Sequence, residues 1–191
     1  MLLAGYRLLN APVMGLQTGG ELARTARAII DPRTLTIVAY ELSGPLLTTR
    51  PALLRIADVR EFSDIGLIVD SSDEFVSPDD IIKLGEIYDL RFDPLGMNVI
   101  SDEKHRKLGK VIGYTLEATG FTIQQISVKR PLVHSFADTE LLVHRSQITE
   151  INDKEIIVHH ESTVRKPMVE AVRSVYHNPF RNENSQPIKR H

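Results

Sequence analysis

The chain has 191 residues, of which 42% are hydrophobic, 25% charged and 6% aromatic, and its net charge is −2. This is the composition of an ordinary globular protein, and no stretch approaches the roughly 18 consecutive apolar residues of a membrane span. The chain has no cysteine, which excludes disulfides and thiolate metal sites. The apolar stretch at residues 1–16 lacks a basic leader and a clear cleavage site, so we expect a cytoplasmic protein.

The charge is distributed unevenly along the chain. Residues 1–90 carry 8 Lys and Arg against 13 Asp and Glu, residues 91–164 carry 9 against 10, and residues 165–191 carry 6 against 2. The net charges of these segments are −5, −1 and +4. The sequence therefore predicts an acidic body with a basic tail.

The first half of the chain is predicted to consist of short strands. Pro12 interrupts the first of them, which favours an edge or bent strand because proline cannot donate to a ladder. Turn residues at 17–20 and 31–34 bound the second strand, and a loop at 43–51 follows the third. The expected strands are 7–16, 23–31, 35–42, 53–56, 58–62 and 67–69.

A helix is predicted over residues 78–88, between the two halves. Ser77 is a favourable cap, Pro78 suits the first helical position, and Asp79 and Asp80 place acids in the first turn. Apolar residues then follow at roughly helical spacing. The segment is therefore expected to link the two halves.

The second half repeats the order of parts of the first. Residues 22–42 superpose on residues 108–128 at a constant offset of 86, without a gap. This pattern predicts a duplicated β-fold, and a single all-β domain without duplication is the alternative. The expected strands are 95–100, 108–116, 121–128, 141–144, 147–151 and 156–158. The expected domains are 1–76, a linking helix at 77–89, 90–164, and a C-terminal helix with a flexible basic tail at 165–191.

Several motifs resemble the PRC-barrel family. Leu108-Gly109-Lys110-Val111 is similar to the step that opens this fold, the first half having Ala23-Arg24-Thr25 for Gly-Lys-Val, and 142–158 is similar to its closing section. The family includes the photosynthetic reaction-centre H subunit and the second domain of a ribosome maturation factor. The resemblance implies two tandem small, bent antiparallel β-barrels. It also implies an adaptor that binds other proteins and has no shared catalytic residues.

No set of residues in the sequence favours catalysis or a cofactor. His159 and His160 are adjacent on a strand and point to opposite faces, so they cannot easily share a metal ion with His144. The acidic residues between 70 and 80 include no glycine for the bend of a calcium loop. No nucleophile-elbow pattern is present. We therefore expect a protein without enzyme activity.

Two segments are candidates for partner binding. The first is the basic stretch around the turn at 101–107, which could meet phosphate or an acidic protein face. The second is an amphipathic helix after Pro167 whose apolar residues share one face. Such a short helix is marginal alone and needs a surface, either its own domain or a partner. The candidate residues are Lys104, Arg106, Lys107, Lys110, Met168, Val169, Val172, Val175 and Tyr176.

The sequence thus favours an adaptor that binds another macromolecule, with ribosome maturation or RNA metabolism as the context that the resemblance implies. Direct RNA binding through the basic turn and tail is the alternative, although 6% aromatic residues offer few stacking platforms. A small-ligand or metal module using His144 and His159 is the second alternative. The oligomeric state and the identity of the partner stay open.

Overall fold

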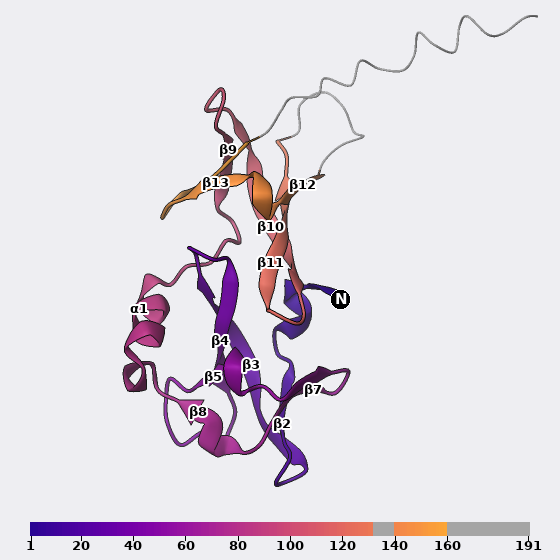
Figure 1. Cartoon of the computed structure of the whole chain (residues 1–191), viewed down its shortest axis with the longest axis vertical. Helices are drawn as coiled ribbons and strands as arrows, with labels where there is room; N and C mark the ends of the chain where they lie inside the picture. The colour runs from indigo at the N-terminus through magenta and orange to yellow at the C-terminus, as the bar shows by residue number, and fades with distance from the viewer. Residues whose placement is uncertain (132–139, 160–191) are drawn as a thin grey trace, which may run out of the picture. The chain divides into compact units, whose positions relative to one another are not determined.

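The computed structural model describes residues 1–131 and 140–159 (Figure 1). These residues contain fourteen strands and one α-helix, α1 at Ile82–Leu90. Short 3-10 helices lie at Gly5–Leu8, Ile56–Asp58, Ser72–Glu74, Pro78–Asp80 and Arg145–Gln147. The strands are β1 (Leu2–Ala4), β2 (Pro12–Gly15), β3 (Gly20–Asp31), β4 (Thr36–Ser43), β5 (Leu53–Arg55), β6 (Glu61–Ser63), β7 (Gly66–Val69), β8 (Phe75–Val76), β9 (Asn98–Ser101), β10 (Lys107–Glu117), β11 (Thr122–Lys129), β12 (Glu140–His144), β13 (Ile148–Ile151) and β14 (Glu155–Val158).

The strands form one mixed sheet that is not closed into a barrel. Its main path runs β13-β14-β9-β10-β11-β4-β3-β2-β7-β6, with β1, β12, β5 and β8 attached at its sides. The predicted all-β class is confirmed. The prediction of purely antiparallel pairing is wrong at two places, because β2 pairs with β7 and β9 pairs with β14 in parallel. Each parallel partner returns only after several intervening elements, and such distant pairing leaves no local signal in the sequence.

Some boundaries also differ from the predicted ones. The segment 7–16 is divided between a 3-10 helix and β2, and β1 at the N-terminus was not predicted. The short strand expected at 58–62 is β6, which follows a 3-10 helix and begins at Glu61. The helix expected at 78–88 is present as a 3-10 turn followed by α1. Its N-terminus is fixed by the Ser77 amide, which donates to the Asp80 carboxylate over 2.6 Å.

The irregularities of the sheet recur at the same offset of 86 residues. In each half, the pairing of neighbouring strands skips one residue at three places. Such a skipped residue marks a β-bulge. In the first half these residues are Leu22, Ala26 and Val38. In the second half they are Leu108, Ile112 and Gln124.

Left-handed backbone conformations recur at that offset as well. The pairs with φ between 45° and 82° are Asn10 and Gly96, Gly19 and His105, and Leu35 and Phe121. Most L-residues avoid positive φ, so these backbone conformations are unusual. They recur at the offset of 86 although the residue types at the paired positions differ. The parallel pairing of β2 with β7 likewise has its counterpart in that of β9 with β14. The two halves therefore follow one backbone plan.

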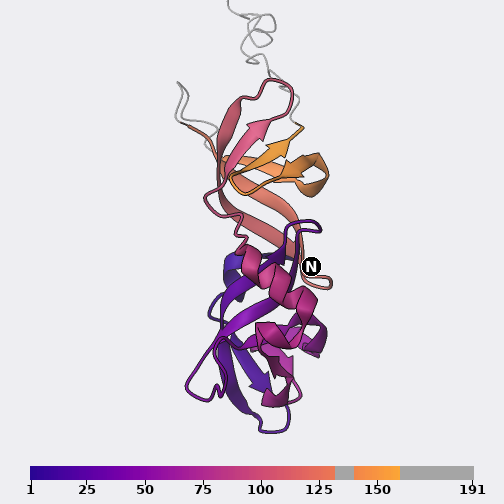
Figure 2. The same cartoon turned by 90° about the vertical axis from the view of Figure 1, so that its left-hand side faces the viewer.

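The helix α1 covers the outer face of the first half and is more than a link. Leu84 and Ile87 are buried in a cluster with Ile29, Ala39 and Leu53, which come from β3, β4 and β5. Figure 2 shows α1 in magenta running along these strands. No helix in the described residues is long and apolar enough to cross a membrane.

The tip of the hairpin β3–β4 contacts the tip of the hairpin β10–β11 through two equivalent hydrogen bonds. The Ile37 amide donates to the Phe121 carbonyl over 2.9 Å, and the Ile123 amide donates to the Leu35 carbonyl over 2.8 Å. These residues are again 86 apart, so the contact is the same from either side. The Phe121 ring also packs edge-on against Phe62 of the first half, with ring centroids 6.5 Å apart.

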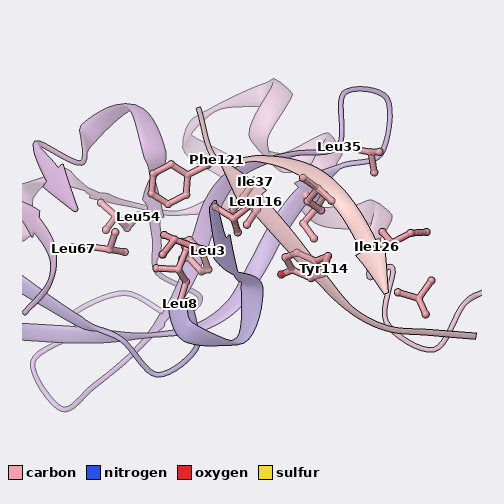
Figure 3. Packing of buried hydrophobic residues seen from close by; sticks show 14 of the residues in the cluster. Leu3, Leu8, Leu35, Ile37, Leu54, Leu67, Tyr114, Leu116, Phe121 and Ile126 are labelled. Atoms are coloured by element: carbon pink, nitrogen blue, oxygen red, sulfur yellow. The ribbon is translucent and has the colours of Figure 1, made fainter. Parts of the chain in front are cut away.

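The larger of the two apolar clusters in the described residues runs through both halves. It includes the N-terminal Leu3 and Leu8, which are buried. The strand β1 pairs with β10 of the second half, so the N-terminal residues join the halves a second time. Figure 3 shows side chains of both halves in this core, among them Leu54 and Leu67 of the first half and Leu116 and Phe121 of the second.

Candidate functional site: a basic surface on the second half

Four cationic side chains gather where β10 and β11 leave the centre of the sheet. Lys107, Lys110, Lys129 and Arg130 line a hollow of about 470 Å³, and we call these four residues the basic surface. The three lysines are exposed and Arg130 is half-buried. The remaining lining residues carry no charge and are Gly96, Gly109, Val111, Ile112 and Pro131.

The register of the sheet brings these cations together. Lys110 on β10 lies directly opposite Lys129 on β11. Gly109 allows the two strands to approach closely at this point, because a Cβ there would collide with the Lys129 carbonyl oxygen. Among the described residues, none of the four cations forms an ion pair with a carboxylate. Like charges opposite each other on neighbouring strands are unfavourable, so the positive charge here is concentrated at a cost to the fold.

The same place in the first half is electrically neutral. At an offset of 86 residues, Lys107 corresponds to Glu21 and Lys110 corresponds to Arg24. Arg24 and Glu21 form an ion pair of 2.7 Å, which satisfies both charges. Lys129 and Arg130 correspond to the uncharged Ser43 and Gly44. The four positions thus carry no net charge in the first half and four positive charges in the second.

The hollow has an apolar centre whose exposed aliphatic residue has only a small counterpart in the first half. Ile112 is the bulged residue of β10, and its side chain is 52% exposed. Its counterpart at the equivalent bulge is Ala26. Val111 and Pro131 extend the apolar lining. The lining of the hollow is therefore apolar at its centre and cationic at its edge.

The structure groups only some of the residues predicted for partner binding. Lys107 and Lys110 line the hollow, whereas Lys104 and Arg106 are exposed in the turn between β9 and β10 and do not line it. The predicted helical residues lie outside the described residues: Met168, Val169, Val172, Val175 and Tyr176.

Sequence reasoning missed three residues of the site. Lys129 and Arg130 fall outside the strand predicted at 121–128, but Lys129 is the last residue of β11. Ile112 lies inside the strand predicted at 108–116, and only the ladder register reveals its bulge. A comparison of charges at the 86-residue offset was the available signal, since it separates Lys129 and Arg130 from their uncharged counterparts.

The histidines considered as metal ligands have separate partners. His144 Nδ1 lies 2.8 Å from Ser146 Oγ, and His159 Nδ1 lies 3.1 Å from Asp102 Oδ2. His160 lies outside the described residues. In the described part of the chain, no group of three or more His, Asp or Glu side chains is placed to hold a metal ion.

Two of the acidic residues between 70 and 80 have local partners, Asp70 and Asp80. Arg60 pairs with Asp70 through its guanidinium, and that hydrogen bond holds the pKa of the Asp70 carboxyl below its ordinary value. Asp80 accepts the Ser77 amide at the start of the 3-10 turn. These contacts explain the two acids as parts of the fold.

Comparison with family models and with curated proteins found no match to this chain. Function is therefore argued from the basic surface and its difference from the equivalent place in the first half.

Proposed function

We propose that this chain is a non-catalytic adaptor that binds another macromolecule through the basic surface. The observation that carries the proposal is the contrast between the two halves. One backbone plan carries a neutral ion pair at Glu21 and Arg24 in the first half. At the equivalent place of the second half it carries Lys107, Lys110 and Lys129, which form no ion pair within the described residues. A fold requires neither of these charge patterns, so the cluster fits a role in binding.

The organisation that we propose is two copies of a PRC-barrel-like module. The matching bulges, left-handed residues and parallel pairs at one offset support the duplication. The resemblance of Leu108-Gly109-Lys110-Val111 to that family supports the type of module. By analogy with the ribosome maturation factor, ribosome assembly or RNA metabolism is the proposed context.

The C-terminal part of the sequence fits the same duplication. The residues with which α1 packs on its sheet are Ile81, Leu84, Ile87 and Tyr88. At an offset of 88, the sequence has aliphatic residues at the first three of these positions and tyrosine at the fourth. The predicted amphipathic C-terminal helix lies outside the described residues and stays a prediction, with this apolar face: Met168, Val169, Val172, Val175 and Tyr176.

Affinity capture with a matched pair of charge variants tests the adaptor role. The double variant Lys110→Glu/Lys129→Glu reverses the basic surface, and Lys83→Glu/Lys154→Glu makes the same change of charge at exposed sites elsewhere. We expect the wild-type chain and the control to retain the same partner from cell extract, and the first variant to lose it. Capture of the same set of partners by the wild-type chain and by both variants would contradict the proposal.

Ribonuclease treatment of the extract addresses the RNA alternative. A partner that survives the treatment is bound as a protein. If capture depends on intact RNA and weakens steeply with salt, the basic surface binds phosphates directly.

A further inference from the structure

We propose that the ligand of the basic surface is an acidic peptide segment with one aliphatic or aromatic side chain among its carboxylates. This inference rests on the proposed adaptor function and adds the chemistry of the partner. The hollow offers two kinds of recognition, cations at its edge and an apolar centre, and the ligand must match both.

The apolar centre is the place for the anchoring side chain. Ile112 projects from a bulge, and Val111 and Pro131 line the hollow beside it. A volume of about 470 Å³ is large enough for a leucine or phenylalanine side chain with part of its backbone. Burying such a side chain contributes about 1.5–3 kcal/mol, which is about a tenfold or greater gain in affinity.

The cations are the place for the flanking carboxylates. Lys110 and Lys129 lie opposite each other across β10 and β11, and Lys107 and Arg130 extend the positive charge along both strands. Carboxylates on either side of the anchor would reduce the repulsion between these cations. In the first half, the Glu21 carboxylate already fulfils this role for Arg24. The bound peptide thus supplies the carboxylates that the first half provides from its own chain.

The shape and composition of the hollow favour a peptide over two other anionic partners. No aromatic ring lines this described site, so a single-stranded nucleic acid would find no stacking platform. A lipid surface is less well matched, because Ile112 is the one large aliphatic side chain exposed in the described lining, whereas membrane-bound surfaces bury an extended apolar face. Nucleic acid and membrane are therefore outcomes of the test.

The test measures binding of two short fluorescent peptides to the full chain. Both consist of Asp and Glu around one central position, which is Leu in one peptide and Ser in the other. We expect the Leu peptide to bind about tenfold more tightly. Ile112→Ala introduces the alanine that the first half has at this position. It should weaken binding of the Leu peptide and leave binding of the Ser peptide unchanged. This coupling identifies Ile112 as the contact of the anchor.

Charge variants complete the experiment. Lys107→Glu recreates beside Lys110 the arrangement of Glu21 and Arg24. It should weaken the binding of both peptides about threefold or more. The controls are Lys83→Glu for charge and Ile65→Ala for an exposed isoleucine of the first half, and both should leave affinity unchanged. A short uridine oligonucleotide and vesicles with anionic lipids are measured alongside.

Equal affinity for the two peptides, or an equal effect of Ile112→Ala on both, would overturn the proposal of an apolar anchor. Tighter binding of the oligonucleotide or of the vesicles, abolished by Lys107→Glu, would assign the surface to that partner instead. Either result leaves the adaptor role standing if capture still depends on Lys110 and Lys129. If capture is independent of these lysines, the adaptor proposal itself fails.

Discussion

At the scale of residues, two buried tyrosines occupy opposite strands of the repeated hairpin. Tyr40 on β4 pairs with Ala28, whereas Tyr114 on β10 pairs with Ile126, so each half places its large ring on a different strand. Gly5 packs against the Tyr114 ring, where a Cβ would collide with it. Burial raises the pKa of both phenols, that of Tyr114 to about 12.

These tyrosines predict a loss of stability in alkali. An unfolded tyrosine ionises near pH 10, but folding keeps both phenols protonated above that pH. Their contribution to the free energy of unfolding is therefore complete below about pH 10. It falls above that pH by about 1.4 kcal/mol per pH unit for each tyrosine, in the case of Tyr114 up to a pH of about 12.

Urea unfolding measured across this range checks the prediction. Tyr114→Phe should make the fall with pH shallower than in the wild-type chain, and Tyr6→Phe, at an exposed position, serves as the control. The same slope in all three proteins would mean that Tyr114 does not stay protonated in the folded state.

At the scale of elements, the difference between the halves lies on their outer faces. Leu53 on β5 is fully buried beneath α1. Leu53 pairs with Glu41 on β4, and Leu142 on β12 pairs with Ser127 on β11. Since Glu41 and Ser127 correspond at the offset of 86, Leu142 is the counterpart of Leu53. Leu142 is 58% exposed. Helix α1 thus covers Leu53 in the first half and is held there by apolar contacts.

Neighbouring residues of α1 provide a test of this cover. Leu84→Ala removes a side chain that is 6% exposed and should lower the free energy of unfolding by about 2–4 kcal/mol. Ile82→Ala removes a side chain that is 81% exposed and should change it by less than about 0.5 kcal/mol. Chemical denaturation measures both, and equal effects would show that α1 does not pack as described.

The sequence predicted those elements whose signals are local. The central hairpins were found because turn residues bound runs of alternating apolar side chains, and α1 because Ser77 and Pro78 mark its start. The parallel partners β7 and β14, the strand β1 and the bulge at Ile112 depend on contacts between distant residues, which no local pattern records. Half of the basic surface was missed for this reason, since Lys129 joins Lys110 only through the ladder.

At the scale of the described chain, residues 1–131 and 140–159, the two halves share one core. Side chains of β1, β10 and β11 pack with those of β4 and β7 in a single cluster. The reciprocal hydrogen bonds at Ile37 and Ile123 and the edge-on packing of Phe62 and Phe121 join the halves further. The unfolding of one half would expose apolar surface of the other.

We therefore predict that both halves unfold in one cooperative transition. Calorimetry should give equal calorimetric and van't Hoff enthalpies. Phe121→Ala, at the contact between the halves, should lower stability by about 3–5 kcal/mol while the transition stays single. Two separate transitions in the wild-type chain would contradict a shared core.

The reciprocal meeting of the hairpin tips has a consequence for how this molecule could diversify. Such a contact is the kind that two identical subunits make around a twofold axis, but here one polypeptide supplies both sides. Association is then intramolecular and holds at any dilution. In a homodimer every substitution would appear twice, whereas in this chain one copy could acquire Ile112 and its lysines while the other kept Ala26 and an ion pair.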